Sequence, residues 1–302
     1  MSGPGTADDR WPVSVFEPSG RLRAPNGPSV AWYDFGGEGP TLLLVHATGF
    51  CAGALAPMAR LCNSRFHCVA IDQRAHGASD PPPDGDFSWH GFADDALAVV
   101  HELGLAHPFA FGHSSGGAAV LLAEETEPGT FAGLYCFEPV VFPGEVPLEP
   151  SVEANPLATG ALRRRSRFAD RFEALANFSS RPPFAGLDPA VLAAYVDNGF
   201  EVDPGGGIRL RCRREDEAQV YAQFFSHDTF ARLDRVRCPV TLACGAQTDA
   251  VGPDLLERYA ARLATCERVV LPGLGHFGPL EDPAGVAESA LGSMALGAAG
   301  PA

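Results

Sequence analysis

The sequence has few basic residues for its number of acidic ones. Its 302 residues include 22 lysines and arginines against 37 aspartates and glutamates, so the formal net charge is -15. A surface of this charge repels phosphate backbones and anionic lipid, which makes nucleic acid and membrane surfaces poor partners. We therefore expect neither nucleic acid nor a membrane as a partner, and we interpret the acidity mainly as an aid to solubility.

Long apolar runs are also missing. The longest runs are far too short to cross a bilayer. The first residues, MSGPGTADDRWPVS, lack the basic start and apolar core that are typical of a secretory leader. No internal repeat is visible. These observations predict a cytoplasmic protein.

Paired cysteines are absent as well. The 8 cysteines are scattered, never stand as C-x-x-C, and several lie in apolar runs such as LYCF and TLACG. This pattern is typical of buried free thiols in a reducing compartment and argues against a disulfide framework or a zinc site. We expect no metal.

Strand-like and helical patterns alternate over residues 29–139 and again over residues 234–298. Runs such as TLLLVH and FHCVAID are apolar throughout and too short for helices. Apolar strands that alternate with helices indicate a parallel sheet covered on both faces. The predicted fold class is therefore α/β, with a doubly wound, mostly parallel sheet, preceded by an N-terminal segment and first strand over residues 1–28.

The alternation stops over residues 140–233. This segment is rich in proline, arginine and phenylalanine, with helical patterns that include residues 167–178 and a GGG turn at residues 205–207. We predict a mostly helical cap. Because ligands bind outside the carboxyl ends of parallel strands, the cap is expected to pack there.

The stretch GHSSG, residues 112–116, lies between a predicted strand and a predicted helix. It matches G-x-S-x-G, in which small residues flank a serine because the backbone passes too close for larger side chains. The turn lifts the hydroxyl clear of the sheet. Ser114 is therefore the candidate nucleophile.

A serine hydroxyl needs a base, and the base needs a carboxylate to orient it. His276, in the glycine-rich loop LPGLGHFGP after the strand ERVVLP, is the candidate base. Asp249, a few residues after the strand PVTLACG, is our preferred acid. Glu138, at the end of the strand FAGLYCFE, is the alternative acid.

Two backbone N–H groups should bind the oxyanion that forms when the serine attacks. The residue after the nucleophile, Ser115, supplies one, and the start of its helix adds a positive dipole. The loop after TLLLVH supplies the other, for which we choose Thr48. His46 is expected to brace this loop by hydrogen bonds.

Taken together, the motifs resemble those of the α/β-hydrolase superfamily. VHATGF is similar to its oxyanion loop, with Ala47 where glycine is common, and IDQRAHGASD is similar to its D-x-R-G-x-G-x-S stretch, with Ala75 in place of a glycine. GHSSG, GAQTD and PGLGHFGPLEDP resemble the nucleophile, acid and histidine loops, in the chain order of that family. The resemblance implies a structural role for Asp72 and Arg74 and a helical cap at residues 140–233.

The resemblance also narrows the chemistry. Relatives that open epoxides or remove halogen attack with an aspartate, whereas this chain carries Ser114. The predicted function is a serine hydrolase of carboxylic esters, lactones or related acyl compounds, acting through an acyl-serine intermediate without a cofactor. The alternatives are a carbon–carbon bond hydrolase, a perhydrolase, or a non-catalytic ligand-binding member. We interpret the arginine run at residues 163–167 as a solvated helix face, with an anionic substrate as the alternative.

Overall fold

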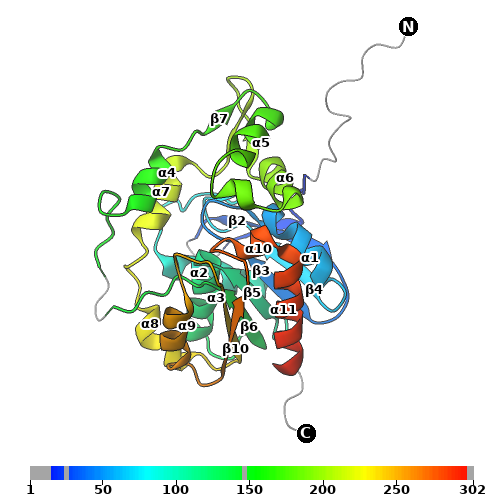
Figure 1. The fold of residues 1–302 in the computed structure, drawn as a ribbon, viewed down its shortest axis with the longest axis vertical. Coiled ribbons are helices and arrows are strands. Elements are labelled where there is room, and N and C mark those ends of the chain that lie inside the picture. Colours follow the sequence, from blue (N-terminus) through cyan, green and yellow to red (C-terminus); the bar gives the residue numbers. More distant parts are fainter. Residues whose placement is uncertain (1–14, 24–26, 145–147, 298–302) are drawn as a thin grey trace.

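Eight strands form one sheet through the middle of the molecule (Figure 1). The computed structural model describes residues 15–23, 27–144 and 148–297. The sheet order is β1-β2-β4-β3-β5-β6-β10-β11. β2 is antiparallel to both β1 and β4, and the remaining pairs are parallel. The strands are β1 Gly20–Arg23, β2 Ser29–Gly36, β3 Thr41–Val45, β4 His67–Ile71, β5 Phe109–His113, β6 Gly133–Phe137, β10 Val240–Gly245 and β11 Cys266–Leu271.

The predicted α/β fold class with a mostly parallel sheet is confirmed. Side chains of β3 alternate between two cores, with Leu42 and Leu44 in one and Leu43 and Val45 in the other. A strand whose two faces are both covered must be apolar throughout, which explains runs such as TLLLV and GLYCF. Residues 1–14 and 24–26 of the predicted N-terminal segment, with the stretch considered as a leader, lie outside the described residues.

Helices cover both faces of the sheet. α2 (Trp89–Glu102), α3 (Ser115–Thr126) and α9 (Pro253–Ala260) share one core, and α1 (Ala56–Cys62) and α11 (Pro283–Gly297) pack together in the other. The short helices η2 (Ala52–Leu55) and α10 (Gly278–Glu281) belong to the second core as well. This doubly wound arrangement directs the loops after β3, β5, β6, β10 and β11 to one edge of the sheet.

The segment of residues 140–233 lies beside that edge, and most of it forms the upper part of the molecule in Figure 1. α6 packs against η2 and α1, whereas α8 returns to pack against α3. The division of the chain into a catalytic domain and a cap at these residues remains a prediction. Its elements are α4 Pro156–Leu162, β7 Arg167–Phe168, α5 Arg171–Ser179, η3 Phe184–Gly186, α6 Pro189–Asn198, β8 Phe200–Val202, β9 Ile208–Leu210, α7 Arg214–Ala222, α8 Thr229–Arg232 and η4 Leu233–Arg235.

This inserted segment contains a small antiparallel sheet that we did not predict, in the order β7-β9-β8. The start of the stretch predicted as helical, Arg167–Phe168, is β7 rather than helix. The helix starts only after Asp170, whose carboxylate accepts a hydrogen bond from the Glu173 N–H and caps α5. The predicted glycine turn lies between β8 and β9, where Gly206 and Gly207 have positive φ angles.

All eight cysteines are free thiols and seven of them are buried, as the scattered cysteine pattern predicts. Among the described residues, no helix has both the length and the apolar character needed to cross a membrane.

Candidate active site

Ser114 stands at the turn between β5 and α3. Its backbone has φ 55° and ψ -114°, a conformation that a residue with a side chain rarely adopts. The Ser114 N–H donates a hydrogen bond to the Phe137 carbonyl (2.9 Å), which ties the turn to the end of β6. A strained conformation that neighbouring strands hold in place is typical of a functional position.

The glycines that flank Ser114 are required by close packing, as predicted. A Cβ on Gly112 would lie 2.5 Å from the Gly116 carbonyl oxygen, inside the turn itself. A Cβ on Gly116 would lie 2.3 Å from the carbonyl oxygen of Val45, at the end of β3. The first turn of α3 therefore presses directly against the strand that leads into the predicted oxyanion loop.

Ser114, His276 and Glu138 form a hydrogen-bonded row. The Ser114 hydroxyl donates to His276 Nε2 over 3.1 Å, and His276 Nδ1–H donates to Glu138 Oε2 over 2.6 Å. His276 comes from the loop between β11 and α10, where Gly273 has φ 77°. A serine, an imidazole and a buried carboxylate in this sequence have the geometry of a nucleophile, a base and the group that orients the base.

The prediction that Asp249 pairs with His276 is wrong, and the alternative, Glu138, occupies that position. Asp249 is exposed, at the tip of the loop after β10. The same loop instead wraps around the Glu138 carboxylate. Gly245 N–H donates to Oε1 (3.0 Å), and the Thr248 hydroxyl (2.7 Å) and Val251 N–H (3.3 Å) donate to Oε2.

The surroundings of Glu138 keep it ionised. The side chain is fully buried, and burial alone would raise its pKa. The hydrogen bond and charge of His276, with the hydrogen bonds from Thr248 and Gly245, outweigh burial, so the pKa of Glu138 lies below its usual value. A carboxylate in this state can hold the His276 ring in one orientation and stabilise it when the ring gains a proton.

His113 holds the backbone of His276 through a hydrogen bond. Its Nε2–H donates to the His276 carbonyl oxygen over 2.8 Å, while its ring is completely buried. Burial, followed by the nearby charge of His276, lowers the pKa of His113 to about 3. The ring is therefore neutral at physiological pH and fixes the backbone of the histidine loop. Sequence reasoning did not single out this residue.

The predicted oxyanion loop, residues 46–50, is held by two neutral histidines. His46 Nδ1–H donates to the Ala47 carbonyl (2.8 Å) while its Nε2 accepts from the Gln73 N–H (3.0 Å). His76 Nε2 accepts from the Gly49 N–H (2.9 Å). The predicted bracing role of His46 is confirmed. Burial lowers the pKa of both histidines, so both rings are uncharged at neutral pH.

Thr48 lies in this loop and is 94% buried, since its exposure is 6%. Its hydroxyl is also without a partner among the described residues. Within the same residues, no hydrogen bond uses the backbone N–H of Thr48 or of Ser115. Both N–H groups are therefore free to bind a ligand.

A cavity of about 460 Å³ opens beside the loop, between it and the inserted segment. Thr48 and Phe50 of the loop and Phe277, the residue after His276, form its inner wall. A second cavity, of about 530 Å³, lies between residues 142–144, Leu148 and the helices α8 and α9. Neither Ser114 nor His276 is among the described lining residues of either cavity. The 460 Å³ cavity is the one of these two that reaches Thr48 and Phe277, the residue next to His276.

Comparison with known proteins identifies the family. The protein-family model described as "Alpha/beta hydrolase family" matches residues 42–289, which is most of the chain. The chain belongs to the alpha/beta hydrolase family. It is therefore an enzyme, and the predicted membership in this superfamily is confirmed.

Individual relatives agree with this assignment. The hydrolase is 26% identical over 244 residues to 2-(acetamidomethylene)succinate hydrolase of Mesorhizobium japonicum, covering 80% of this chain and 83% of that protein. It is 25% identical to the bifunctional esterase/perhydrolase DCH of Acinetobacter calcoaceticus, over 71% of this chain and 76% of the relative. A crystal structure of E-2-(acetamidomethylene)succinate hydrolase matches its fold with a TM-score of 0.75 at 21% identity, covering 92% and 98% of the two chains.

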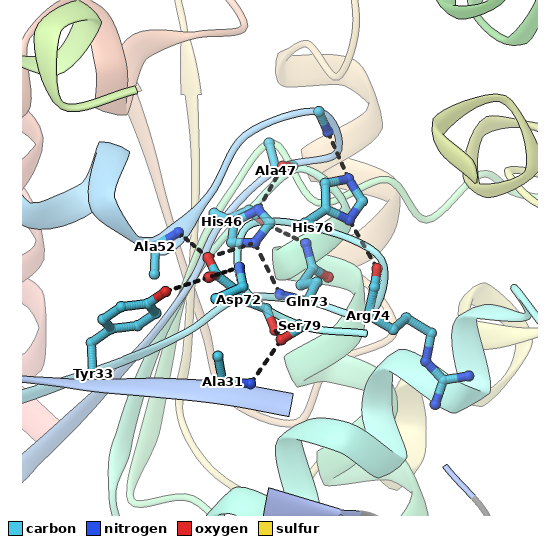
Figure 2. A network of polar contacts seen from close by, with 12 residues as sticks. Ala31, Tyr33, His46, Ala47, Ala52, Asp72, Gln73, Arg74, His76 and Ser79 are labelled. Atoms are coloured by element: carbon cyan, nitrogen blue, oxygen red, sulfur yellow. Dashed lines mark hydrogen bonds and ion pairs between the residues drawn. The ribbon is translucent and has the colours of Figure 1, made fainter. Parts of the chain in front are cut away.

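A buried polar network anchors the loop of residues 46–50 of this hydrolase (Figure 2). Asp72 accepts hydrogen bonds from Ala52 N–H (2.7 Å), the Tyr33 hydroxyl (2.6 Å) and Ala78 N–H (2.7 Å), which ties the loop after β4 to β2 and η2. Burial nevertheless raises the pKa of Asp72. Gln73 donates to the His46 carbonyl (2.5 Å) and the Ser115 hydroxyl (3.3 Å), so it bridges the loop of residues 46–50 and the turn at Ser114.

The neighbouring Arg74 forms a buried ion pair with Asp95 of α2, with Nε and Oδ2 2.7 Å apart. The structural role that the family resemblance implies for Asp72 and Arg74 agrees with these contacts. Gln73 is a site residue that the sequence analysis missed. Its position between Asp72 and Arg74, as the middle residue of the D-x-R motif, could have identified it.

Proposed function

We propose that this hydrolase cleaves a carboxylic ester, a lactone or a related acyl compound through an acyl-serine intermediate. The observation that carries the proposal is the row in which Glu138, His276 and Ser114 are joined by hydrogen bonds of 2.6 and 3.1 Å. A buried carboxylate with no role beyond packing would not be directed at the far nitrogen of an imidazole that contacts a strained serine.

The proposed reaction has two halves. His276 Nε2 takes the proton of the Ser114 hydroxyl as the oxygen attacks the acyl carbon, and then gives that proton to the leaving group. A water molecule replaces the leaving group, loses a proton to His276 and attacks the acyl-serine. His276 gives this proton to the Ser114 oxygen as the bond to the acyl carbon breaks, which frees the acid product and restores the Ser114 hydroxyl. Glu138 keeps Nδ1–H directed toward itself in both halves. No cofactor or metal is needed for these steps.

The negative charge of the tetrahedral intermediate needs donors that are already in place. The free N–H groups of Thr48 and Ser115 support their proposed role as these donors. The network of His46, His76 and Gln73 holds both segments, so little reorganisation would accompany the reaction. In this proposal the inserted segment, residues 140–233, serves as a cap over the site.

The relatives support a hydrolytic reaction on an acyl compound. One is a hydrolase of a succinate derivative and another is an esterase and perhydrolase, as their names state. The free buried thiols fit a reducing environment, and we propose the cytoplasm as the location of the protein.

A fluorophosphonate probe tests the proposal, because it labels only a serine whose hydroxyl is activated. We expect stoichiometric labelling of Ser114, loss of labelling in Ser114→Ala, and strong reduction in His276→Gln. Ser226→Ala is the matched control, because it removes an equally small hydroxyl that is outside the row. A native protein that stays unlabelled while a known serine hydrolase reacts in the same sample would overturn the proposal.

A further inference from the structure

The 460 Å³ cavity beside the oxyanion loop has an unusual lining for an acidic protein. Four arginines reach it, together with one acidic residue, Glu217. The rest of the lining is mainly apolar and aromatic, including Phe50, Phe178, Phe184 and Phe277. A ligand in this cavity would therefore meet an apolar wall next to the candidate active site and guanidinium groups from the inserted segment.

Two of the four arginines are neutralised by acidic partners. Arg164 donates from one nitrogen to both carboxylate oxygens of Glu217, at 2.6 and 2.5 Å, and from another to the Tyr195 hydroxyl at 2.7 Å. Arg165 pairs with Glu173 at 2.6 Å. These two guanidinium groups add no net charge to the cavity.

The other two, Arg163 and Arg181, have no acidic partner among the described residues. They approach the cavity from different elements. Arg163 follows the last residue of α4, and Arg181 follows the end of α5 by two residues. Two uncompensated positive charges thus converge on one cavity of a chain whose formal net charge is -15.

The positions of these arginines have a simpler explanation that must be separated from binding. A cation near a helix C-terminus stabilises the helix dipole, and both residues stand at such ends. That effect accounts for a positive charge at each helix end. It does not account for both charges lining the same cavity, where Glu217 is the single acidic residue among the described lining residues although acidic residues outnumber basic ones in the chain.

We propose that Arg163 and Arg181 form a subsite for a carboxylate carried by the substrate, so that the substrate class is an anionic acyl compound such as a monoester of a dicarboxylic acid. The planar guanidinium group matches a carboxylate through two parallel hydrogen bonds. The apolar wall takes the carbon chain, and the acyl carbon lies toward Thr48 and Ser114. This inference rests on the proposed function and names the substrate of that same site.

Paired ester substrates test the subsite. The 4-nitrophenyl monoesters of glutarate, adipate and suberate carry a terminal carboxylate, and the esters of pentanoate, hexanoate and octanoate have the same chain lengths without it. We expect the double variant Arg163→Gln/Arg181→Gln to raise KM at least about tenfold for the best anionic ester, which is what losing a charge-assisted hydrogen bond costs. The neutral esters should change less than about twofold, as substitutions distant from the reacting atoms do.

The matched control is Arg60→Gln/Arg237→Gln, which removes two exposed charges outside the cavity. It separates a local subsite from the general effect of lowering the positive charge. If the control raises KM for the anionic esters as much as the cavity variant does, the subsite is overturned. Equal losses on anionic and neutral esters in the cavity variant, or no loss on any member of the series, also overturn it and leave only the role at helix ends.

Calorimetric binding of adipate keeps this test separate from the proposed function. Adipate should bind the wild-type protein and the control variant, with at least about tenfold weaker binding to the cavity variant. If no ester is hydrolysed and the fluorophosphonate probe fails, the proposed function falls, while adipate binding still tests the subsite. If neutral esters are hydrolysed but adipate binding does not depend on the two arginines, the subsite falls and the hydrolase proposal stands.

Discussion

Glu138 combines a positive backbone φ of 45° with a carboxylate that is fully buried. The residue directly after a strand is turned by this φ value so that its side chain meets the loop after β10 and the histidine loop. Both conditions cost free energy in isolation, through backbone strain and through desolvation. The donors from Gly245, Thr248 and His276 offset the desolvation.

Substitution at Glu138 should separate it clearly from Asp249. We expect Glu138→Gln to lower kcat by about 10⁴, because an amide no longer favours the tautomer and the charge that the His276 ring needs. Asp249→Asn changes an exposed side chain, so kcat should stay within about a factor of two. Steady-state kinetics on a 4-nitrophenyl ester, with circular dichroism to verify folding, decide between them. If Asp249→Asn lowers kcat strongly and Glu138→Gln does not, then Asp249 and not Glu138 orients His276.

His113 should make stability depend on pH in a defined direction. Its pKa is about 3 in the folded protein against an ordinary value of 6.5, so its contribution is fully present above pH 6.5. The contribution is lost as the pH falls from 6.5 toward 3, because only the unfolded chain gains the proton there.

The variant His113→Gln isolates this effect. Glutamine cannot gain the proton, and its amide N–H can still donate to the His276 carbonyl. The stability of the wild type relative to this variant should therefore fall by about 1.4 kcal/mol per pH unit once the pH is below the ordinary histidine value. Urea unfolding of both proteins across this range measures it. A difference that is constant with pH would show that His113 is protonated equally in both states.

The sequence identified those individual site residues that a local motif marks. Ser114 is marked by Gly112 and Gly116, and His276 by the glycines of its loop. The acid could not be identified in the same way. Glu138 and Asp249 each follow a strand at the same sheet edge, and only the path of the loop after β10 decides which carboxylate reaches the imidazole.

The start of α3 packs closely against the end of β3. This packing positions the turn at Ser114 and the loop of residues 46–50 against each other, and Gln73 adds hydrogen bonds to both. A side chain inserted there has no free space, because the atoms it would meet belong to backbone.

The substitution Gly116→Ala tests this contact. Its Cβ would lie 2.3 Å from the Val45 carbonyl oxygen and 2.6 Å from that of His46. We expect a loss of about 1–3 kcal/mol in the free energy of unfolding, with lower kcat because the two segments are forced apart.

The matched control is Gly292→Ala in α11, where a Cβ meets nothing within 4 Å. Helix propensity should make that variant slightly more stable, by up to about 1 kcal/mol. Thermal or urea unfolding of the two variants measures the contrast. If both substitutions stabilise the protein, α3 and β3 are not packed as described.

Strands of the main sheet were predictable because they are short apolar runs, and its helices were predictable because they follow these runs with helical patterns. The small sheet β7-β9-β8 was not, since its strands have two or three residues and carry no such pattern. Arg167–Phe168 illustrates the difficulty. These residues continue smoothly into a helical pattern, and only pairing with β9, distant along the chain, makes them a strand.

At the scale of the whole molecule, the inserted segment contacts the core through a buried ion pair beside the oxyanion loop. A Cβ on Gly49 would lie 2.6 Å from Glu217 Oε1 and 3.2 Å from a terminal nitrogen of Arg164. Gly49 also has φ 81°, so glycine is required there for both conformation and space. The segment and the loop are therefore in direct contact.

Breaking this pair from one side should cost more than removing it altogether. In Arg164→Met the Glu217 carboxylate stays buried without its partner, and we expect a loss of about 3–5 kcal/mol in the free energy of unfolding. The double variant Arg164→Met/Glu217→Gln removes both charges and should recover part of that loss. Urea unfolding of Arg164→Met, Glu217→Gln and the double variant measures the coupling. Additive losses would show that the two side chains act independently.

The sequence by itself determined the sheet with its two helical layers, the strained serine turn and the histidine loop. Each of these depends on residues that are close together along the chain, through apolar period or through glycine spacing. Tertiary structure alone decided that Glu138 holds His276, that His113 and Gln73 brace the site, and that Arg163 and Arg181 line one cavity. Those outcomes join segments that are distant in sequence, and burial and hydrogen bonding between such segments depend on the packed structure.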